Sequence, residues 1–298
     1  MAESRAEVAP AARHPVRRHR GAGAGLWVLP PVMVLAGVFL YPLSLIVREA
    51  VTGGGGAIRL GAALSVFHST LFLNGLYNTV RIALGASAGC ILLGFVLGLV
   101  LAFVPFPGRT FAARLIDTFI ALPTFLVALA FTFFYGSAGV VNEGLMKLTG
   151  APLPPIDFLY SAWGVILAEV TVYTPFVLRP LLAAFSMIDP AQIEVASSLG
   201  ARAPMIIRRI IFPAALPALM AGGSLCLLLT VNEFGIVLFI GAKGVITLPL
   251  LVYSKAIQEF DYTTACIIAV ANLVLSLGLY SLYRILVGRM GGKRAGLV

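Results

Sequence analysis

The stretch EVASSLGARAPMIIRRIIFPAALP, from Glu194 to Pro217, is a polar, proline-interrupted segment in a mainly apolar part of the chain. It contains three arginines, one glutamate and three prolines. Apolar runs over 160–184 and 212–240 border it, and each is long enough to cross the roughly 30 Å hydrocarbon core of a bilayer as a helix. The stretch therefore predicts a water-exposed loop between two membrane spans.

The composition of the whole chain supports this interpretation. Of its 298 residues, 60% are hydrophobic and 11% are charged, with a mean hydropathy of +1.00. Soluble globular domains carry about 25% charged residues. The net charge of +9 comes mostly from short segments between apolar runs. Because there is no basic stripe with interleaved aromatic residues, nucleic-acid binding is not expected.

Six apolar runs predict an all-α integral membrane protein with six transmembrane helices. The runs are 26–48, 78–104, 115–136, 160–184, 212–240 and 264–288. The shorter segment 60–77 is predicted to be an interfacial helix on the outer side. The expected organisation is a disordered basic tail over 1–25, a membrane domain over 26–288 and a second tail over 289–298.

The distribution of lysine and arginine predicts the orientation. If the N-terminus is cytoplasmic, most of these cations fall in the inner segments, as the positive-inside rule expects. The outer segments keep only six of them, which are Arg48, Arg59, Arg81, Lys147, Lys243 and Lys255. Both tails are then cytoplasmic. The first apolar run is too long for a cleaved signal, so an uncleaved signal-anchor is favoured over a twin-arginine signal at Arg17-Arg18.

The second run carries two pairs of glycines at a spacing of four residues, Gly85 with Gly89 and Gly94 with Gly98. Such pairs let helix backbones approach closely in a membrane. Glycine is also common in membrane helices without this role, so close packing is one of two interpretations.

Residues 189–213 predict two short cytoplasmic helices. Asp189 is suited to cap the first helix and Pro190 to its first position, with Gln192 three residues after the cap. Gly200 is suited to end that helix in a left-handed conformation. The second helix is expected from Pro204 to Ile210.

One face of the first helix is expected to be apolar, through Ile193, Ala196 and Leu199, while Glu194 faces elsewhere. Such a helix suits a groove on another protein. The alternative is an ordinary loop that rests on its own bundle.

The same stretch resembles the "EAA" loop of permease subunits of binding-protein-dependent (type I) ABC importers. The family pattern is Glu-Ala-Ala, three residues, Gly, nine residues and Ile-x-Leu-Pro. This chain has Glu194-Val195-Ala196, then Gly200, then Ile210-Ile211-Phe212-Pro213, with the spacing kept and two conservative departures. The resemblance also covers LYNTVRIAL, from Leu76 to Leu84, and extends to the end of the sixth span.

This resemblance implies a MetI-like fold whose loop over 189–213 couples the spans to a separate ATPase. It implies coupling roles for Glu194, Ala196, Leu199, Gly200, Ile210 and Pro213. It further implies a second permease chain, an extracytoplasmic binding protein and a bacterial inner membrane. ATP and Mg²⁺ are expected on the ATPase and no cofactor on this chain, because the sequence has no GxxxxGK[ST] phosphate loop.

The substrate is indicated by a second resemblance. Residues 232–257, NEFGIVLFIGAKGVITLPLLVYSKAI, look like the permeases of 2-aminoethylphosphonate importers. Related permeases carry polyamines, sulfate, molybdate or ferric iron, and the fold does not choose among them.

Polar residues inside the spans are candidates for the transport route, because they are costly in lipid. They are Glu169, Tyr173 and Thr174 in the fourth span, and Asn232 and Glu233 in the fifth. Counted from Pro213, Glu233 is expected about 30 Å along a continuous helix. It could line a cavity, lie near the outer rim or form a structural salt bridge.

Two other classes of function are weighed against the importer. A secondary carrier or channel would need its own coupling carboxylates or pore ring and would act without an ATPase. A membrane enzyme would need a catalytic constellation, and the sequence has no HExxH motif or Ser-His arrangement. The three cysteines lie in apolar runs without a CxxC or Cys/His cluster, so neither a disulfide framework nor a metal site is expected. Two of the three histidines lie in the basic tail and one is isolated, which also argues against a metal centre.

Overall fold

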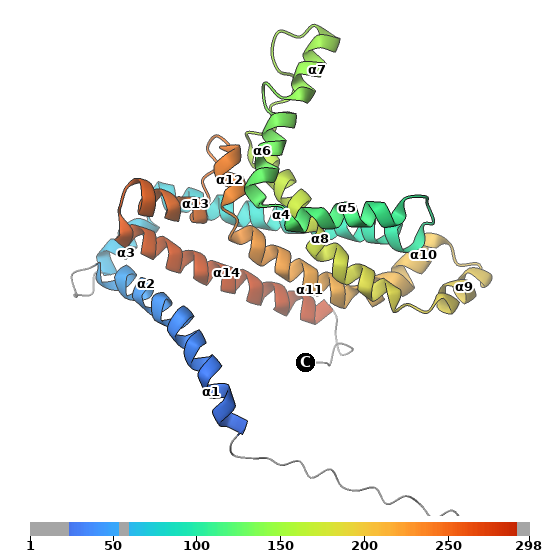
Figure 1. The fold of residues 1–298 in the computed structure, drawn as a ribbon, viewed down its shortest axis with the longest axis horizontal. Helices are drawn as coiled ribbons and strands as arrows, with labels where there is room; N and C mark the ends of the chain where they lie inside the picture. Colours follow the sequence, from blue (N-terminus) through green and yellow to red (C-terminus); the bar gives the residue numbers. More distant parts are fainter. Residues whose placement is uncertain (1–23, 54–59, 291–298) are drawn as a thin grey trace, which may run out of the picture. The chain divides into compact units, whose positions relative to one another are not determined.

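The computed structural model describes residues 24–53 and 60–290, and all regular elements within these ranges are helices (Figure 1). The α-helices are α1 Ala24–Leu35, α2 Tyr41–Thr52, α3 Leu60–Phe67, α4 Thr70–Phe103, α5 Arg109–Ala121, α6 Thr124–Tyr135, α7 Val140–Thr149, α8 Ala162–Ser186, α9 Pro190–Ser198, α10 Ala203–Ile206, α11 Phe212–Val231, α12 Gly235–Ile240, α13 Leu248–Tyr253 and α14 Tyr262–Met290. Three π-helical turns join some of them, η1 Ala36–Leu40, η2 Ile207–Ile211 and η3 Ser254–Gln258. The predicted tails lie outside the described residues, apart from Ala24 and Gly25 in α1 and Arg289 and Met290 in α14.

The described residues up to Leu45 belong to a unit of their own. In it α1 carries Pro30 and Pro31 and continues through the π turn η1 into α2. Its large apolar side chains, from Trp27 to Tyr41, are exposed. A helix that is apolar all round suits lipid or another membrane helix, which agrees with the predicted first span.

Six helical segments of the described residues are long and apolar enough to cross a membrane, as expected. They are Trp27–Thr52, Thr70–Phe103, Thr124–Thr149, Ala162–Ser186, Ala203–Val231 and Tyr262–Gly288. The all-α membrane fold is therefore confirmed.

The predicted start of the second span was wrong. Helix α4 begins at Thr70, because the Ser69 hydroxyl accepts a hydrogen bond from the Phe72 N–H at 3.2 Å and caps the helix there. Segment 60–77 is therefore not one interfacial helix, since only α3 and the first turns of α4 lie in it. Arg81, one of the six cations counted on the outer side, lies within α4, as it lies within the predicted run 78–104.

The predicted third span is also divided. Its residues belong to α5 and α6, which are separated at Leu122 and Pro123. Proline has no N–H to continue the helical ladder, and it disfavours a helical conformation at the residue before it. Helix α7 then follows α6 after a turn at Gly136–Gly139.

The described residues from Ile46 onward form a second unit. Its centre is formed by α4, α8 and α11, with α14 alongside (Figure 1). All four glycines of the predicted pairs face α8. A Cβ on Gly89 would lie 2.5 Å from a methyl group of Val170, and one on Gly94 would lie 3.1 Å from the side chain of Val177. The absence of side chains at these positions therefore permits the close packing of α4 on α8, which decides between the two interpretations in favour of packing.

Polar side chains fix the loops to this bundle. The Asn78 side-chain amide donates to the carbonyl oxygens of Gly244 and Ile246, at 3.3 and 3.1 Å. Asn142 is fully buried, and its side chain donates to the Ile156 carbonyl and accepts from the Ile156 N–H. These bonds satisfy backbone groups that have no helical partner.

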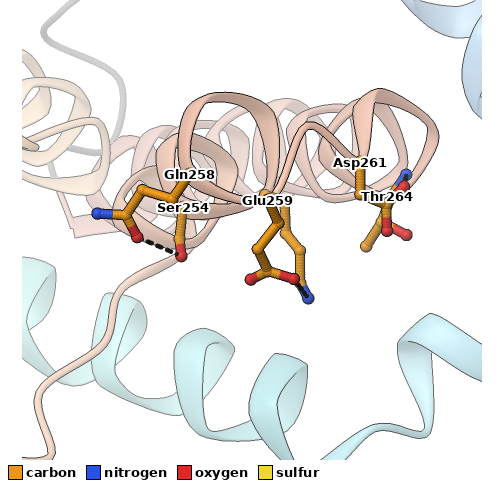
Figure 2. Close-up of polar contacts among 6 residues, drawn as sticks. Ser254, Gln258, Glu259, Asp261 and Thr264 are labelled. Atoms are coloured by element: carbon orange, nitrogen blue, oxygen red, sulfur yellow. Dashed lines mark hydrogen bonds and ion pairs between the residues drawn. The ribbon is translucent and has the colours of Figure 1, made fainter.

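The turn before α14 is stabilised by short-range polar contacts (Figure 2). Ser254 donates to Gln258 at 2.9 Å, Lys255 pairs with Glu259 at 2.5 Å, and an Asp261 oxygen accepts the Thr264 N–H at 3.1 Å. Hydrogen bonds from Thr264 hold the pKa of Asp261 below its usual range, although partial burial opposes this. Asp261 is thus an N-terminal cap that favours the start of the last span.

Candidate functional site

The polar segment over residues 189–213 contains α9 and α10 and lies at one end of the bundle (Figure 1). The Asp189 carboxylate accepts the Ala191 N–H at 3.0 Å, and Pro190 is the first residue of α9. The helix ends before Gly200, which has a φ of +81°, and the Ala201 N–H donates back to the Ala196 carbonyl. The predicted cap and glycine elbow are both confirmed.

The predicted second short helix is not a separate element. Helix α10 continues through η2 into α11, so residues Ala203–Val231 form one helix. Within η2 the Phe212 N–H bonds to the Ile207 carbonyl, five residues back. Pro213 follows directly and has no N–H, so we attribute the local π turn to accommodation of its ring. As a result, the loop after Gly200 is joined rigidly to the fifth span.

The apolar face predicted for α9 is only partly correct. Ile193 and Ala196 are half-buried against the core, but Leu199 is 82% exposed. Leu199 lies at the C-cap, where the backbone leaves the helix and turns the side chain away from that face. Met187, which ends α8, and Val195 on α9 are also exposed, at 84% and 59%. We refer to the three exposed apolar residues Met187, Val195 and Leu199 as the α9 patch.

The other predicted coupling residues differ in their exposure. Glu194 on α9 and Pro213 at the start of α11 are exposed, and Ile210 in η2 is half-buried. The coupling role of these residues stays a prediction. Met187 was not among the predicted residues, and its exposure is visible only in the structure.

Three of the predicted route residues are brought together inside the bundle. The Tyr173 hydroxyl on α8 donates a hydrogen bond to Glu233 Oε2, and Glu233 Oε1 accepts the Ile236 N–H at 2.8 Å. Glu169 lies one helical turn before Tyr173 on α8 and is fully buried. Thr174 is also buried, but its hydroxyl bonds to the Val170 carbonyl of its own helix at 2.6 Å.

Glu233 does not lie along a continuous fifth span, which corrects the 30 Å estimate. Helix α11 ends at Val231, and α12 starts at Gly235. The carboxylate caps α12 through the Ile236 N–H and is 6% exposed. Within residues 24–53 and 60–290, no lysine or arginine forms an ion pair with it.

The last route residue, Asn232, belongs to a second polar group between α11 and α14. Its side-chain oxygen accepts from Asn272 at 3.0 Å, and its amide donates to the Ser276 hydroxyl at 3.4 Å. Asn272 and Ser276 were missed, although two polar residues four apart on a predicted span indicate one shared face.

The described part of the chain contains no group of three or more His, Cys, Asp or Glu side chains that could hold a metal ion. The buried thiols of Cys90 and Cys226 lie beside backbone carbonyls of α8. The buried polar residues of this site therefore offer hydrogen bonds and close packing and no metal centre within the described residues.

Comparison with known proteins agrees with this geometry. Residues 94–292 match the family model described as "Binding-protein-dependent transport system inner membrane component". The chain is 62% identical over 266 residues to the Salmonella typhimurium (strain LT2) protein "Putative 2-aminoethylphosphonate transport system permease protein PhnU", covering 89% of this chain and 93% of that protein. It is 31% identical over 211 residues to the sulfate transport system permease protein CysT of the same organism, covering 67% and 73%.

Two solved structures share the fold. A chain of a bacterial ABC transporter involved in the import of the acidic polysaccharide alginate superposes with a TM-score of 0.76 at 20% identity, covering 91% of this chain and 97% of that chain. A chain of the MetNI methionine ABC transporter, in an inward-facing conformation, superposes with a TM-score of 0.52 at 20% identity, covering 74% and 94%.

Proposed function

The chain belongs to the family of binding-protein-dependent transport system inner membrane components, and on this premise we propose its substrate, its motor and its orientation. It is a permease subunit of an ABC importer and a multi-pass inner membrane protein with a MetI-like fold.

The proposed substrate is 2-aminoethylphosphonate. The observation that carries this is the 62% identity, over 89% of the chain, to a protein named for that transport system. Identity to the sulfate permease is half as high and covers less of the chain. A small solute of this kind would be delivered by an extracytoplasmic binding protein, which supplies much of the selectivity.

Titration of the cognate binding protein tests the substrate. We expect saturable heat with 2-aminoethylphosphonate and none with sulfate, molybdate, ferric iron or a polyamine at the same concentration. The charged phosphonate and ammonium groups each demand complementary partners, and a site built for them rejects ligands that leave those partners unpaired. Saturable binding of one of the other ligands, without binding of 2-aminoethylphosphonate, would contradict the proposed substrate and assign that ligand to this permease instead.

The proposed motor is a separate ATPase that docks on the α9 patch. Support comes from three exposed apolar side chains in and next to the capped helix α9, beside the exposed Glu194 and the left-handed Gly200. Ala196 of α9 and Ile210 of η2 are half-buried and pack against the hydrophobic core, so they hold this segment on the bundle. ATP and Mg²⁺ are assigned to the ATPase, and this chain is assigned no catalytic residue.

The proposed assembly contains two permease chains in the lipid bilayer, either two copies of this chain or this chain with a homologue. The alginate and methionine importer structures support only the fold of the single chain. The exposed apolar side chains on α1 and α4 suit contact with lipid or with that second chain.

Both termini are proposed to be cytoplasmic, with the α9 patch on the same side. Reporter fusions at Gly150 and Gly200 are expected to report opposite sides of the membrane, because one span, α8, separates these two glycines. Cytoplasmic signal is expected at Gly200, since Arg202, Arg208 and Arg209 follow it. The same side for both fusions would contradict the six-span arrangement.

The route through the membrane remains a prediction at Glu169, Tyr173, Thr174, Asn232 and Glu233. Of these, Asn232 is exposed, while the other four are buried in the described conformation. Contact of the buried four with substrate would require α8 and α12 to move apart.

A further inference from the structure

Glu169 has an unusual environment for a carboxyl group. It is fully buried in the middle of α8, and neither of its oxygens has a hydrogen-bond partner among the described residues. Buried polar groups in native proteins are nearly always paired, so an unpaired one calls for an explanation. The unpaired oxygens of Glu169 are explained if they accept a hydrogen bond in another conformation of the protein.

The neighbouring polar side chains identify the donor that could fill it. Thr174 donates to the Val170 carbonyl at 2.6 Å, and Cys226 donates to the Tyr173 carbonyl at 3.3 Å. The Cys90 thiol lies 3.9 Å from the same Val170 carbonyl. The Tyr173 hydroxyl is different because its acceptor, Glu233, lies on another element. Tyr173 and Glu169 are four residues apart on one helix and therefore share a face.

Glu233 makes the present position of that hydroxyl depend on α12. Its two oxygens bind the Tyr173 hydroxyl and the Ile236 N–H, so it ties the start of α12 to α8. Gly235 is closely packed there, since a Cβ would lie 2.9 Å from the Thr124 hydroxyl of α6. The junction of α11 and α12 is thus held between α8 and α6.

The same junction terminates the helix that begins at the proposed docking loop. Residues Ala203–Val231 form one continuous helix from beside Gly200 to this break. A displacement of α10, at the start of this helix, would shift its far end at residues 232–234. There the Glu233 carboxylate is hydrogen-bonded to Tyr173 on α8. The distance between Tyr173 and Glu169 would change little, because both lie on α8.

We propose that Glu169 is a second acceptor for the Tyr173 hydroxyl, and that Glu169, Tyr173 and Glu233 form a two-position latch in the transport cycle. With α12 seated on α8, Tyr173 binds Glu233; when α12 leaves, Tyr173 binds Glu169 and its hydroxyl is never left unpaired. Glu169 is then a positioning residue that lowers the cost of releasing α12. This role rests on the proposed docking of the ATPase at residues 189–213.

Substitution of Glu169 by methionine separates the latch from a structural role. The Glu169→Met side chain has a similar length and no acceptor. In the purified full complex we expect its unfolding temperature to rise by about 2 °C, because an unpaired buried polar group is removed. Uptake is expected to fall about ten-fold or more, because one hydrogen bond is lost in the released state. Glu169→Gln retains an acceptor oxygen and should keep uptake within about three-fold of wild type.

Tyr173→Phe supplies the second arm. Without the hydroxyl neither position of the latch forms, so uptake should fall and adding Glu169→Met should lower it no further. This lack of additivity is expected of two residues joined by one bond. Glu233→Gln keeps one acceptor oxygen where the carboxylate uses two, for the Tyr173 hydroxyl and the Ile236 N–H. One of these two bonds is therefore lost, and we expect lower uptake while the assembled complex is retained.

The latch is overturned if Glu169→Met lowers the unfolding temperature, if it leaves uptake unchanged, or if its effect and that of Tyr173→Phe multiply. The thermal measurement needs neither substrate nor ATP hydrolysis. It therefore remains informative if the wild-type complex fails to take up 2-aminoethylphosphonate, an outcome that counts against the proposed function instead.

Discussion

Leucine in place of Gly222 is expected to prevent the chain from accumulating as a folded permease. Gly222 lies on α11 where that helix crosses α8. A Cβ at this position would lie 2.8 Å from the Cα of Val177 and 3.1 Å from the carbonyl oxygen of Phe176. These are backbone atoms, so no side-chain rotation relieves the contact. Because even modest overpacking costs about 1–3 kcal/mol, a whole leucine side chain must separate the two helices.

The matched control is the same substitution at Gly278 on α14, where a Cβ would meet nothing within 4 Å. Size-exclusion chromatography of the solubilised chain, with its yield, measures the outcome. We expect Gly278→Leu to behave as wild type and Gly222→Leu to be lost or aggregated. A monodisperse Gly222→Leu protein at normal yield would mean that α8 and α11 do not pack as described.

The spans could be predicted from the sequence because hydropathy over about 20 residues is a physical requirement of the bilayer. Their ends and internal breaks were predicted less well, because a few side chains set each of them and the average hydropathy of a run does not show their effect. Ser69 starts α4 eight residues earlier than the apolar run suggested, through one capping hydrogen bond. Asn232 and Glu233 read as two polar residues inside a span, whereas Glu233 caps a new helix at Gly235.

In the candidate site, features set by a few neighbouring residues could be predicted, whereas contacts between residues far apart in the chain could not. Asp189 and Gly200 were predictable, because a cap and a positive φ are properties of a few neighbouring residues. The pairing of Tyr173 with Glu233 was not, since 60 residues separate them in the chain. Leu199 was assigned to the wrong face, because it lies one residue after the helical periodicity ends.

Valine at Gly200 is expected to uncouple ATP hydrolysis from transport while the membrane bundle stays folded. Gly200 has a φ of +81°, and a residue with a Cβ in this conformation costs about 1–2 kcal/mol. A Cβ there would meet nothing within 4 Å inside the chain, so the substitution produces no internal clash. The branched side chain would instead project beside the α9 patch, where the ATPase is proposed to dock. Both the altered elbow and the added bulk then oppose docking.

Gly150→Val is a matched control for backbone strain. Gly150 ends α7 with a φ of +69°, and a Cβ there also meets nothing within 4 Å. It lies on the other side of α8 along the chain, away from the proposed docking surface. Any loss shared by both variants reports strain alone, and a loss confined to Gly200→Val reports contact with the partner.

Binding-protein-stimulated ATP hydrolysis by the reconstituted complex, with the amount of assembled permease determined, is therefore the most direct test. We expect stimulation close to wild type for Gly150→Val and a loss of about ten-fold or more for Gly200→Val, which corresponds to about 1.4 kcal/mol of coupling. Full stimulation in both variants would show that residues 189–213 are an ordinary loop and would contradict the proposed attachment of the motor.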